Sequence, residues 1–490
     1  MSESNPKKFV ISRDEIRAVY AQGEDAVIRL VEGLLERIAV LEERVEALEN
    51  QISKNSRNSS KAPSSDGFKP RPKSQRRKSE RLSGGQPEHP GKTLEWSADV
   101  HQVEQHCVDA CAVCGQSLSQ VEVEDWDLRQ VRDIAPIQVT VTEHQAEVKC
   151  CPHCQTLNRG EFPPSVNSVV QYGASLKGLM VYLLDYQLLP SARVKELLSD
   201  VFGCEISEAT VYNTRERCFK ELASVEAAIT EQIQHAQVLH CDETGMRVKG
   251  KLWWLHVAST DGLTVYFVHT KRGRDAMDAM EILPNYAGIS VHDGLKSYAQ
   301  YACGHALCNA HHLRELAFIL ERYQQIWAEE MGILLRDLKH QVDQAKTQGQ
   351  TALDADLVQW FEHRYQTLIT AGLVANRVPD PPPDAVKSRG RPKQSPAKNL
   401  LDRLQHQSLV LAFMYDFRVP FDNNQAERDL RMMKLKQKIS GGFRSTEGAQ
   451  MFGRIRGYIS TLKKQGLNVL DALKQVFLGN PTLPTLLQPE

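Results

Sequence analysis

A heptad repeat near the N-terminus constrains the fold of this chain more than any other feature. β-branched residues recur every seven positions, and a leucine follows each of the first three after three positions. The repeat consists of Val31, Leu34, Ile38, Leu41, Val45, Leu48 and Ile52. This is the a/d seam of a coiled coil, and its residue types favour a parallel dimer. The alternative is a single amphipathic helix that packs on its own domain.

The length of 490 residues exceeds one ordinary core and predicts a modular chain of about three domains. A hydrophobic fraction of 41%, a charged fraction of 25% and a net charge of -1 are typical of a soluble protein. No apolar run is long enough to span a bilayer. Residues 1–20 lack the apolar core of a secretory signal, so we expect a cytoplasmic protein without a membrane partner.

Residues 54–95 are rich in Ser, Pro, Gly and Lys/Arg and poor in large apolar side chains. Such a composition cannot form a core, so it predicts a basic flexible linker. Its excess of cations would attract nucleic-acid phosphates without regard to sequence. A solubilising tether is the alternative.

Two C-x-x-C pairs, "CAVC" and "CPHC", follow this linker within residues 96–165. Their cysteines are Cys111, Cys114, Cys151 and Cys154. Four thiolates in two tight turns predict a closed, structural Zn²⁺ site, and the alternation in residues 137–150 predicts a hairpin. Rival ligands are Cys107, Cys150, His106 and His153. The alternative is a set of unligated cytosolic thiols.

Residues 170–236 show a helical pattern. The segment "EISEATVYNTRERCFKEL" is expected to begin a helix with Ser207 as its N-cap. Its polar and basic face is suited to the recognition helix of a helix-turn-helix. A plain helical spacer is the alternative.

From Val238 the composition becomes rich in β-formers. "VLHCDETGMRV", "LWWLHVAST" and "LTVYFVHT" predict a three-stranded meander, followed by a helix and a further strand, "ISVHDGLKSY". Asp242 lies on the first strand and Asp293 at the end of the fourth. Acids in apolar strands are costly unless paired or bound to a cation, so we expect a shared metal site. A turn-forming role is the alternative, mainly for Asp293, which Gly294 follows.

The segment "DNNQAERDLRMMKLKQKISGGFRS" predicts a helix with one glutamate, Glu427, among many cations. If Glu427 joins Asp242 and Asp293 in a Mg²⁺ site, the cations serve a polyanionic substrate. The DNA-binding candidates here are Arg428, Arg431, Lys434 and Lys438. Ala426, Leu430 and Met433 form the expected core-facing stripe. The alternative is a surface helix with scattered salt bridges.

A second basic segment, "KSRGRPKQSPAK", contains Arg389 and Arg391 on either side of a glycine. This compact pattern resembles an AT-hook, which is suited to a narrow A·T minor groove. The alternative is a basic linker.

These motifs together resemble the transposases of the insertion-sequence-66 family, which are bacterial DDE transposases, over nearly the full length of the chain. The matching segments are "NSSKAPSSDG", "GGQPEHPG", the paired cysteines, "CDETGMRV", "VHDGLKSY", "CNAHHLREL", "RGRPKQSPAKNLLDRL" and "DNNQAERDLRMMKLKQKISGGFRS". The resemblance implies an RNase H-like core with Asp242, Asp293 and Glu427 as the metal-binding triad, and a helical insertion between the last two. It also implies a functional basic residue seven positions after the glutamate, here Lys434. Cys150 beside Cys151 departs from the family pattern and leaves the choice of zinc ligand open.

The resulting prediction is a multidomain chain of the α+β and α/β classes. Its expected parts are a coiled coil (1–53), the basic linker (54–95), the zinc-binding β domain (96–165), a helix-turn-helix-like region (170–236), the first part of the catalytic core (237–310), a helical insertion with the AT-hook-like segment (311–400) and the last part of the core (401–480).

The predicted function is that of a transposase that cleaves the ends of its element and joins the 3′-OH to target DNA. The resemblance implies two Mg²⁺ (or Mn²⁺) ions at the triad beside the structural Zn²⁺. Expected partners are the terminal repeats, target DNA, a second copy through the coiled coil, and small accessory proteins of the same element. The expected location is the bacterial nucleoid. The alternative is a catalytically inactive DNA-binding protein derived from a transposase.

Overall fold

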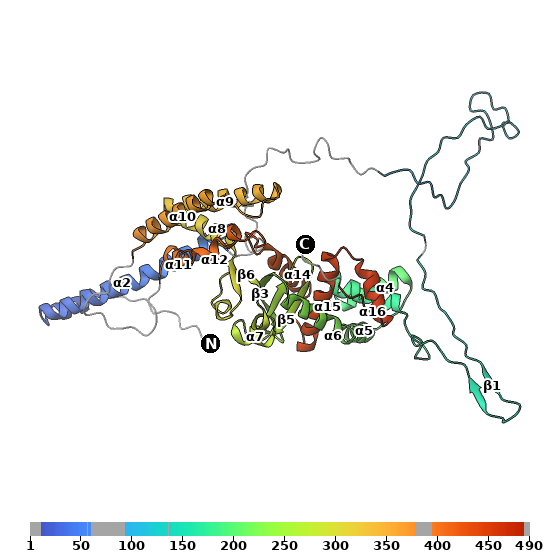
Figure 1. The fold of residues 1–490 in the computed structure, drawn as a ribbon, viewed down its shortest axis with the longest axis horizontal. Coiled ribbons are helices and arrows are strands. Elements are labelled where there is room, and N and C mark those ends of the chain that lie inside the picture. Colours follow the sequence, from blue (N-terminus) through green and yellow to red (C-terminus); the bar gives the residue numbers. More distant parts are fainter. Residues whose placement is uncertain (1–10, 56, 60–93, 136, 378–393, 485–490) are drawn as a thin grey trace. The chain divides into compact units, whose positions relative to one another are not determined.

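The computed structural model describes residues 11–55, 57–59, 94–135, 137–377 and 394–484 (Figure 1). Two units are distinguished within the chain and are described separately. One comprises residues 1–74, 170–190 and 212–490, and the other comprises residues 75–169 and 191–211. Most of the predicted basic linker, and both Arg389 and Arg391, lie outside the described residues.

The secondary structure mixes helices with a mixed sheet, as predicted for the fold class. In chain order the elements are α1 (Arg13–Tyr20), α2 (Glu24–Ser53), β1 (Val148–Cys150), β2 (Leu157–Arg159), α3 (Ala174–Val181), the π-helical turn η2 (Tyr182–Tyr186), α4 (Ser191–Phe202), α5 (Glu208–Glu221), α6 (Ala223–Gln234), β3 (Val238–Val248), β4 (Lys251–Ser259), β5 (Thr264–His269), α7 (Arg274–Ala279), η3 (Leu283–Asn285), β6 (Ile289–His292), η4 (Tyr298–Gln300), β7 (Gly304–Leu307), α8 (Asn309–Tyr323), α9 (Ile326–Thr347), α10 (Ala355–Ala375), α11 (Pro396–Leu404), α12 (Gln407–Val410), α13 (Ala412–Tyr415), α14 (Asn424–Ser440), α15 (Thr446–Lys464) and α16 (Val469–Phe477).

The main sheet has five strands in the order β5-β4-β3-β6-β7. The strands β3, β4 and β5 form the predicted antiparallel meander, and β6 pairs with β3 in parallel. A short fifth strand, β7, pairs in parallel with β6 and was not predicted. The chain thus returns from the meander to place β6 directly beside the first half of β3, so the end of β6 lies next to the middle of β3.

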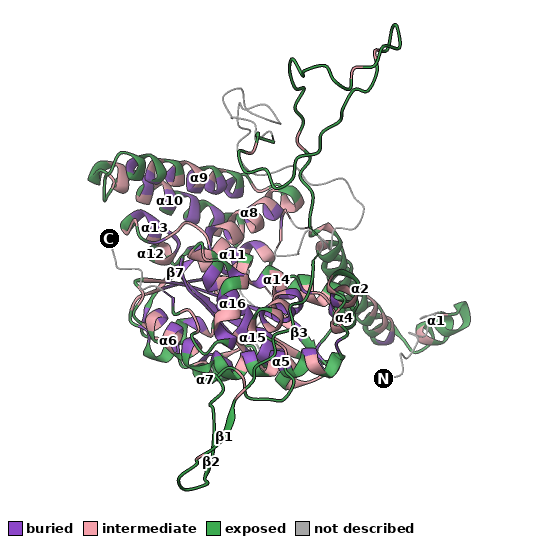
Figure 2. Cartoon of the chain, turned by 90° about the vertical axis from the view of Figure 1, so that its right-hand side faces the viewer, coloured by how far each residue is buried: buried purple, intermediate pink, exposed green. Residues whose placement is uncertain are grey.

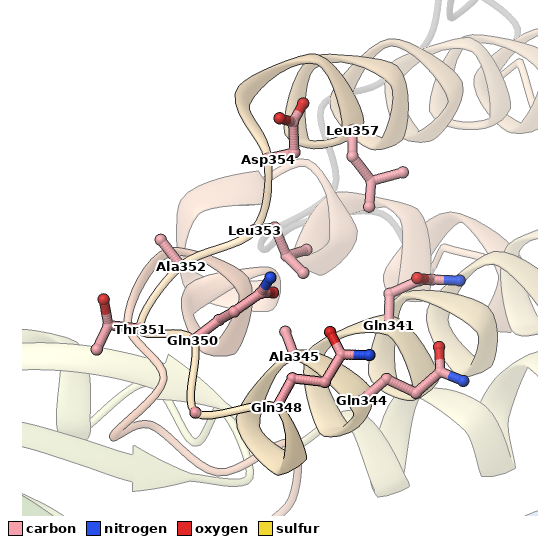
Figure 3. Close-up of a pocket in the computed structure, with 11 residues that line it drawn as sticks. Gln341, Gln344, Ala345, Gln348, Gln350, Thr351, Ala352, Leu353, Asp354 and Leu357 are labelled. Atoms are coloured by element: carbon pink, nitrogen blue, oxygen red, sulfur yellow. The ribbon is translucent and has the colours of Figure 1, made fainter.

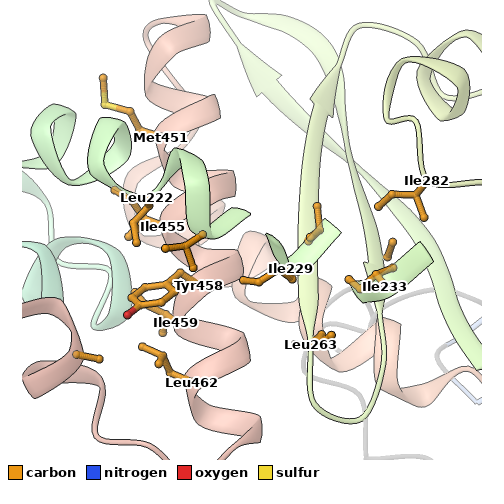
Figure 4. Packing of buried hydrophobic residues seen from close by; sticks show 14 of the residues in the cluster. Leu222, Ile229, Ile233, Leu263, Ile282, Met451, Ile455, Tyr458, Ile459 and Leu462 are labelled. Carbon is orange, nitrogen blue, oxygen red and sulfur yellow. The ribbon is translucent and has the colours of Figure 1, made fainter. Parts of the chain in front are cut away.

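Two hydrophobic clusters hold helices against this sheet. In the first, Ile229 and Ile233 of α6 and Ile455 of α15 pack with strand residues such as Leu239 (Figure 4). In the second, the predicted stripe of α14, formed by Ala426, Leu430 and Met433, is buried against β3 and β4. Burial of these side chains stabilises the position of α14 by about 1.5 to 3 kcal/mol for each large one.

The C-terminal end of α14 is also tied to β3 by backbone hydrogen bonds. The Phe443 amide donates to Arg247 O at 2.7 Å, and the Lys249 amide donates to Phe443 O at 2.9 Å. A Cβ atom on Gly442 would lie 2.6 Å from Arg247 O, so this approach requires a glycine. The "SGGF" segment therefore fastens the helix to the central strand.

The helical insertion between β7 and α14 packs around Trp327, Leu335 and Tyr365, in a cluster that also includes Val291 of β6 and Leu307 of β7. Helices α8, α9 and α10 form its long elements, and α11 to α13 contribute Leu400, Leu404 and other residues to the same core. The packed helical segment thus continues to Tyr415, whereas the predicted insertion ended at residue 400.

The helical region before the sheet contains a buried ion pair. Asp185, in the turn η2, accepts hydrogen bonds from Arg215 Nε at 2.9 Å and from Arg215 Nη2 at 2.6 Å. The Ser207 hydroxyl accepts a hydrogen bond from the Thr210 amide at 3.1 Å, which confirms the predicted cap of α5.

Helix α2 carries the heptad seam, and Figure 2 shows it largely exposed. Val31, Ile38, Leu41, Val45, Leu48 and Ile52 all leave about half or more of their surface open. At the last turns of α2, Glu49 forms an ion pair with Arg322 of α8, and Asn50 accepts a hydrogen bond from the Tyr323 hydroxyl at 3.1 Å. These six seam residues are therefore exposed, whereas Leu34 is half-buried and the end of the helix contacts its own chain.

Residues 94–169 have a different character, because none of their described side chains is buried. Their regular structure is the hairpin of β1 and β2, which flanks Cys151 and Cys154. Residues 137–147 were predicted to form part of a hairpin but contain no strand. Val141, for example, is 90% exposed, so the alternation in this segment does not correspond to a buried face.

No helix of the described residues has both the length and the apolar composition needed to cross a membrane.

Candidate active site

Asp242 and Asp293 meet where β6 ends and its pairing with β3 stops. Asp242 lies within β3, and Asp293 directly follows β6. Carboxylate oxygens of these two residues and of Glu243 lie within 4.8 Å of one another. The two acids come together because their strands are hydrogen-bonded neighbours that run in parallel.

Alternation along β3 directs Asp242 toward α14. Asp242 and Met246 lie four positions apart along the strand, and residues an even number of positions apart share a face of the sheet. Met246 packs with Leu430 and Met433 of α14 in one hydrophobic cluster. The same helix carries Glu427 in its first turn, so the third predicted acid faces the strand that carries the first.

The charge of Asp242 is held in an unfavourable environment. Burial raises the pKa of Asp242 well above its usual range, and the negative charges of Glu243, Asp293 and Glu427 raise it further. A hydrogen bond from the Glu243 amide, at 2.8 Å, acts in the opposite direction. An enclosed group of acids with these properties is suited to a bound cation.

Asp293 combines a turn-forming role with an open position at the site. Its Oδ1 atom accepts a hydrogen bond from the Leu295 amide at 2.9 Å, as in the turn-forming alternative. Its Oδ2 atom lies 3.8 Å from Nη2 of Arg272. One oxygen therefore fixes the turn, and the other lies near the guanidinium of Arg272.

Glu243 is a buried acid to which the sequence analysis assigned no role. Its carboxylate accepts hydrogen bonds from Arg272 Nε and from the Tyr298 hydroxyl, both at 2.8 Å. The guanidinium of Arg272 also stacks on Trp254, 5.0 Å from the ring centroid. Glu243 thus holds Arg272 beside Asp293. The sequence did carry a signal for this role, because a second acid directly follows Asp242 in an apolar strand.

Glu427 lies against the first turn of α8. Its Oε2 atom is 3.4 Å from Arg314 Nη2, and its Oε1 atom is 3.8 Å from His311 Nε2. The Oε1 atom is buried and has no hydrogen-bond partner in the described part of the chain. Cys308, His311 and Glu427 form a second group whose ligand atoms all lie within 4.8 Å.

Asn423 links the elements that carry these groups. Its side chain donates to Cys241 O at 2.7 Å, and its Oδ1 atom lies 2.8 Å from His240 Nδ1. Its backbone amide donates to Cys308 Sγ at 3.1 Å. The start of α14 is therefore fixed both to β3, next to Asp242, and to the start of α8.

Among the predicted DNA-binding residues of α14, Lys434 reaches the sheet. Its Nζ atom donates to Gly245 O at 3.1 Å. Burial lowers the pKa of Lys434, and the nearby charge of Asp242 partly opposes this shift. Arg428 bonds to Gln425 of its own helix at 2.7 Å. Arg431 and Lys438 are exposed.

The predicted zinc ligands form two separate turns. The Gly115 amide donates to Cys111 O at 2.9 Å, and the Gln155 amide donates to Cys151 O at 2.8 Å. A hydrogen bond from Thr156 lowers the pKa of Cys154 to about 7. The ligand groups of three found among the described residues are the two groups above, and none contains these cysteines. Each pair is thus arranged locally, but the structure does not bring the two pairs together.

A cavity of about 580 Å³ lies where α9 turns into α10 (Figure 3). Its polar lining consists mainly of glutamine amides, including Gln341, Gln344, Gln348 and Gln350. None of the predicted catalytic, metal-binding or DNA-binding residues lines it. The acids instead lie on β3 and directly after β6, away from this cavity.

Comparison with known families identifies the family of the chain. The profile of the Transposase IS66 family matches residues 169–451, which is more than half of the chain and includes all three predicted acids. A family of unknown function (DUF6444) matches residues 3–95. No curated protein matches the chain significantly. On the extent of the first match, this chain belongs to the Transposase IS66 family.

Proposed function

We propose that this chain is the DNA transposase of an insertion sequence, and that Asp242, Asp293 and Glu427 are its catalytic triad. In this proposal it binds the ends of its element, hydrolyses a phosphodiester there and transfers the freed 3′-OH to target DNA. The observation that carries the proposal is the convergence of Asp242 and Asp293 at one edge of the sheet, with Glu427 close enough to raise the pKa of Asp242. A meander followed by parallel strands supports an RNase H-like core.

The residues at this edge fit divalent cations. Carboxylate oxygens of Asp242, Asp293 and Glu243 cluster within 4.8 Å of one another, and burial makes the charge of Asp242 unfavourable without a cation. Carboxylate oxygens are the ligands that Mg²⁺ and Mn²⁺ prefer in proteins. When bound, such ions would activate the attacking water or 3′-OH and stabilise the leaving oxygen.

Other residues of the chain position the acids and attract DNA. Arg272 and Arg314 hold Asp293 and Glu427 in place. Arg431, Lys434 and Lys438 lie along α14 beyond Glu427 and would contact phosphates of the substrate, because such contacts set the register of DNA without reading its sequence. Arg389 and Arg391 would add contacts in an A·T minor groove.

The amide variants Asp242→Asn, Asp293→Asn and Glu427→Gln test the triad. Each keeps the size of the side chain but removes its negative charge, so cleavage should fall by about 10³-fold or more while DNA binding persists. The assay is cleavage of a labelled duplex copied from the inverted repeat that bounds the gene, in Mg²⁺ or Mn²⁺, with a gel shift on the same duplex. Glu447→Gln, an exposed acid on α15, is the matched control. Full cleavage by Glu427→Gln would exclude it from the triad.

We also propose that the seam of α2 joins two copies, as an enzyme that holds two DNA ends requires. The exposed seam residues support this assembly. Light scattering on the full chain and on a variant lacking residues 1–53 tests it. The same number of chains per particle in both proteins, with and without DNA, would contradict the coiled coil.

A further inference from the structure

The second ligand group of the core, formed by Cys308, His311 and Glu427, differs chemically from the first. Cys308 directly precedes α8, His311 lies in the first turn of that helix, and Glu427 lies in the first turn of α14. The two helix starts are held together, because the Asn309 amide donates to Phe421 O at 3.1 Å and the Asn423 amide donates to Cys308 Sγ. The group is therefore built into the packing of the fold.

Two atoms of this group lack the partners that buried polar atoms normally have. Glu427 Oε1, which faces His311 Nε2, and the other ring nitrogen of His311, Nδ1, are buried and have no hydrogen-bond partner within the described residues. An unsatisfied buried polar atom is costly and rare, so the bare Oε1 atom points to a ligand on the side of His311 Nε2. Arg314 satisfies only the other carboxylate oxygen of Glu427.

The distances within the group suit a shared ion better than a direct contact. His311 Nε2 and Glu427 Oε1 are 3.8 Å apart, which is too far for a hydrogen bond. Two atoms that each lie about 2.0 to 2.2 Å from one ion can be separated by this distance. The Cys308 sulfur lies within 4.8 Å of both.

A sulfur, an imidazole nitrogen and a carboxylate oxygen do not form a site for Mg²⁺, which prefers oxygen ligands alone. They match the borderline-soft divalent ions of the first transition series. We propose that Cys308, His311 and Glu427 bind one such ion, chemically distinct from the ion held by the oxygen ligands of Asp242 and Asp293. Because Glu427 is shared with the proposed triad, the inference deepens the proposed function and makes the two metal positions inequivalent.

Binding of Co²⁺ to the full chain tests this site, because thiolate and imidazole ligands give Co²⁺ characteristic absorption bands. The zinc-module cysteines would also bind Co²⁺, so the measurement is made on a parent carrying Cys111→Ser and Cys151→Ser. The Co²⁺ content after dialysis should fall by one ion per chain in Cys308→Ser, with loss of the sulfur charge-transfer band. In His311→Gln the Kd for Co²⁺ should rise about 100-fold or more, since even the loss of outer hydrogen-bond partners raises it 10- to 100-fold.

Controls separate this inference from folding effects and from the proposed function. Cys303→Ser replaces a buried cysteine outside the group and should keep the ion. Thermal unfolding of each variant shows whether it is folded. If Cys308→Ser does not fold, His311→Gln provides the test, because its side chain is partly exposed. Unchanged Co²⁺ binding in folded His311→Gln overturns the inference. If the amide variants of the triad still lose cleavage, the proposed function stands regardless.

Discussion

The core sheet and the cysteine-containing segment place their candidate ligands in opposite ways. In the core, Asp242, Asp293 and Glu427 sit on elements that large buried side chains hold in register. In residues 94–169 no described side chain is buried, yet the turns around Cys111 and Cys151 are formed. Hydrophobic burial is thus sufficient to assemble the acids, whereas the two cysteine pairs have local order and no core to join them.

This difference implies that metal has a different role in each region. Buried apolar side chains hold the strands and the helix that carry the acids, so an ion there would contribute chemistry more than folding. A Zn²⁺ bound by all four cysteines would instead supply the cross-link that the segment lacks, since structural zinc contributes directly to folding. Three predictions test how far this contrast holds.

The largest expected effect is the loss of structure in residues 94–169 when zinc is removed. A chelator, or Cys154→Ser, should expose this segment to proteolysis, while the sheet and the helices packed on it stay resistant. The variants Cys107→Ser and Cys150→Ser should retain zinc, because neither residue belongs to the two C-x-x-C pairs. Elemental analysis and limited proteolysis with mass spectrometry measure both results. Identical digestion patterns with and without zinc would remove the contrast.

The second prediction compares ion pairs in the two regions. Asp185→Ala leaves Arg215 buried without its partner, so the free energy of unfolding of the core should fall by about 3 to 5 kcal/mol. Asp127→Ala removes the ion pair of Asp127 with Arg129, whose side chains are more than 80% exposed, and should have no measurable effect. Denaturant unfolding followed by fluorescence measures the change. Equal changes in the two variants would contradict the prediction.

The third prediction concerns stability in acid. Burial lowers the pKa of His256 from 6.5 to about 4, so the folded core keeps this imidazole neutral while the unfolded chain takes up a proton below pH 6.5. Stability is therefore complete above pH 6.5 and is lost as the pH falls toward 4, by up to about 3 kcal/mol. His256→Gln should reduce this loss. His144→Gln, at an exposed position, should leave the dependence unchanged, and the same pH slope in both variants would count against the assignment.

The sequence predicted best those features that depend on local periodicity or on strand order. The meander, the cap at Ser207 and the buried stripe of α14 follow from alternation, capping chemistry and helical spacing. The proximity of Asp242 to Asp293 follows from strand order, because the chain returns from the meander and pairs β6 with β3. These are signals that residues close in sequence can carry.

Other features depend on elements that meet only in the folded chain. Asn423 and Cys308 are far apart in the sequence, and neither carries a local pattern that reveals their hydrogen bond. The strand β7 has only four residues, too few to show alternation. In residues 137–147 alternation was present without a buried face, so the predicted hairpin did not form there. Periodicity indicates a face, but a partner must exist to bury it.

The hydrogen bonds between the starts of α8 and α14 have a consequence for how this protein family can vary. They join the beginning and the end of the helical insertion, so the insertion leaves the core and returns to it at nearly one point. Segments whose ends lie close together can be lengthened, shortened or exchanged with little effect on the host domain. Glu427 follows this junction by four residues and is fixed through Asn423 to β3. The insertion can therefore vary beyond the first turns of α8, which carry His311 and Arg314, while the spacing of the three acids is preserved.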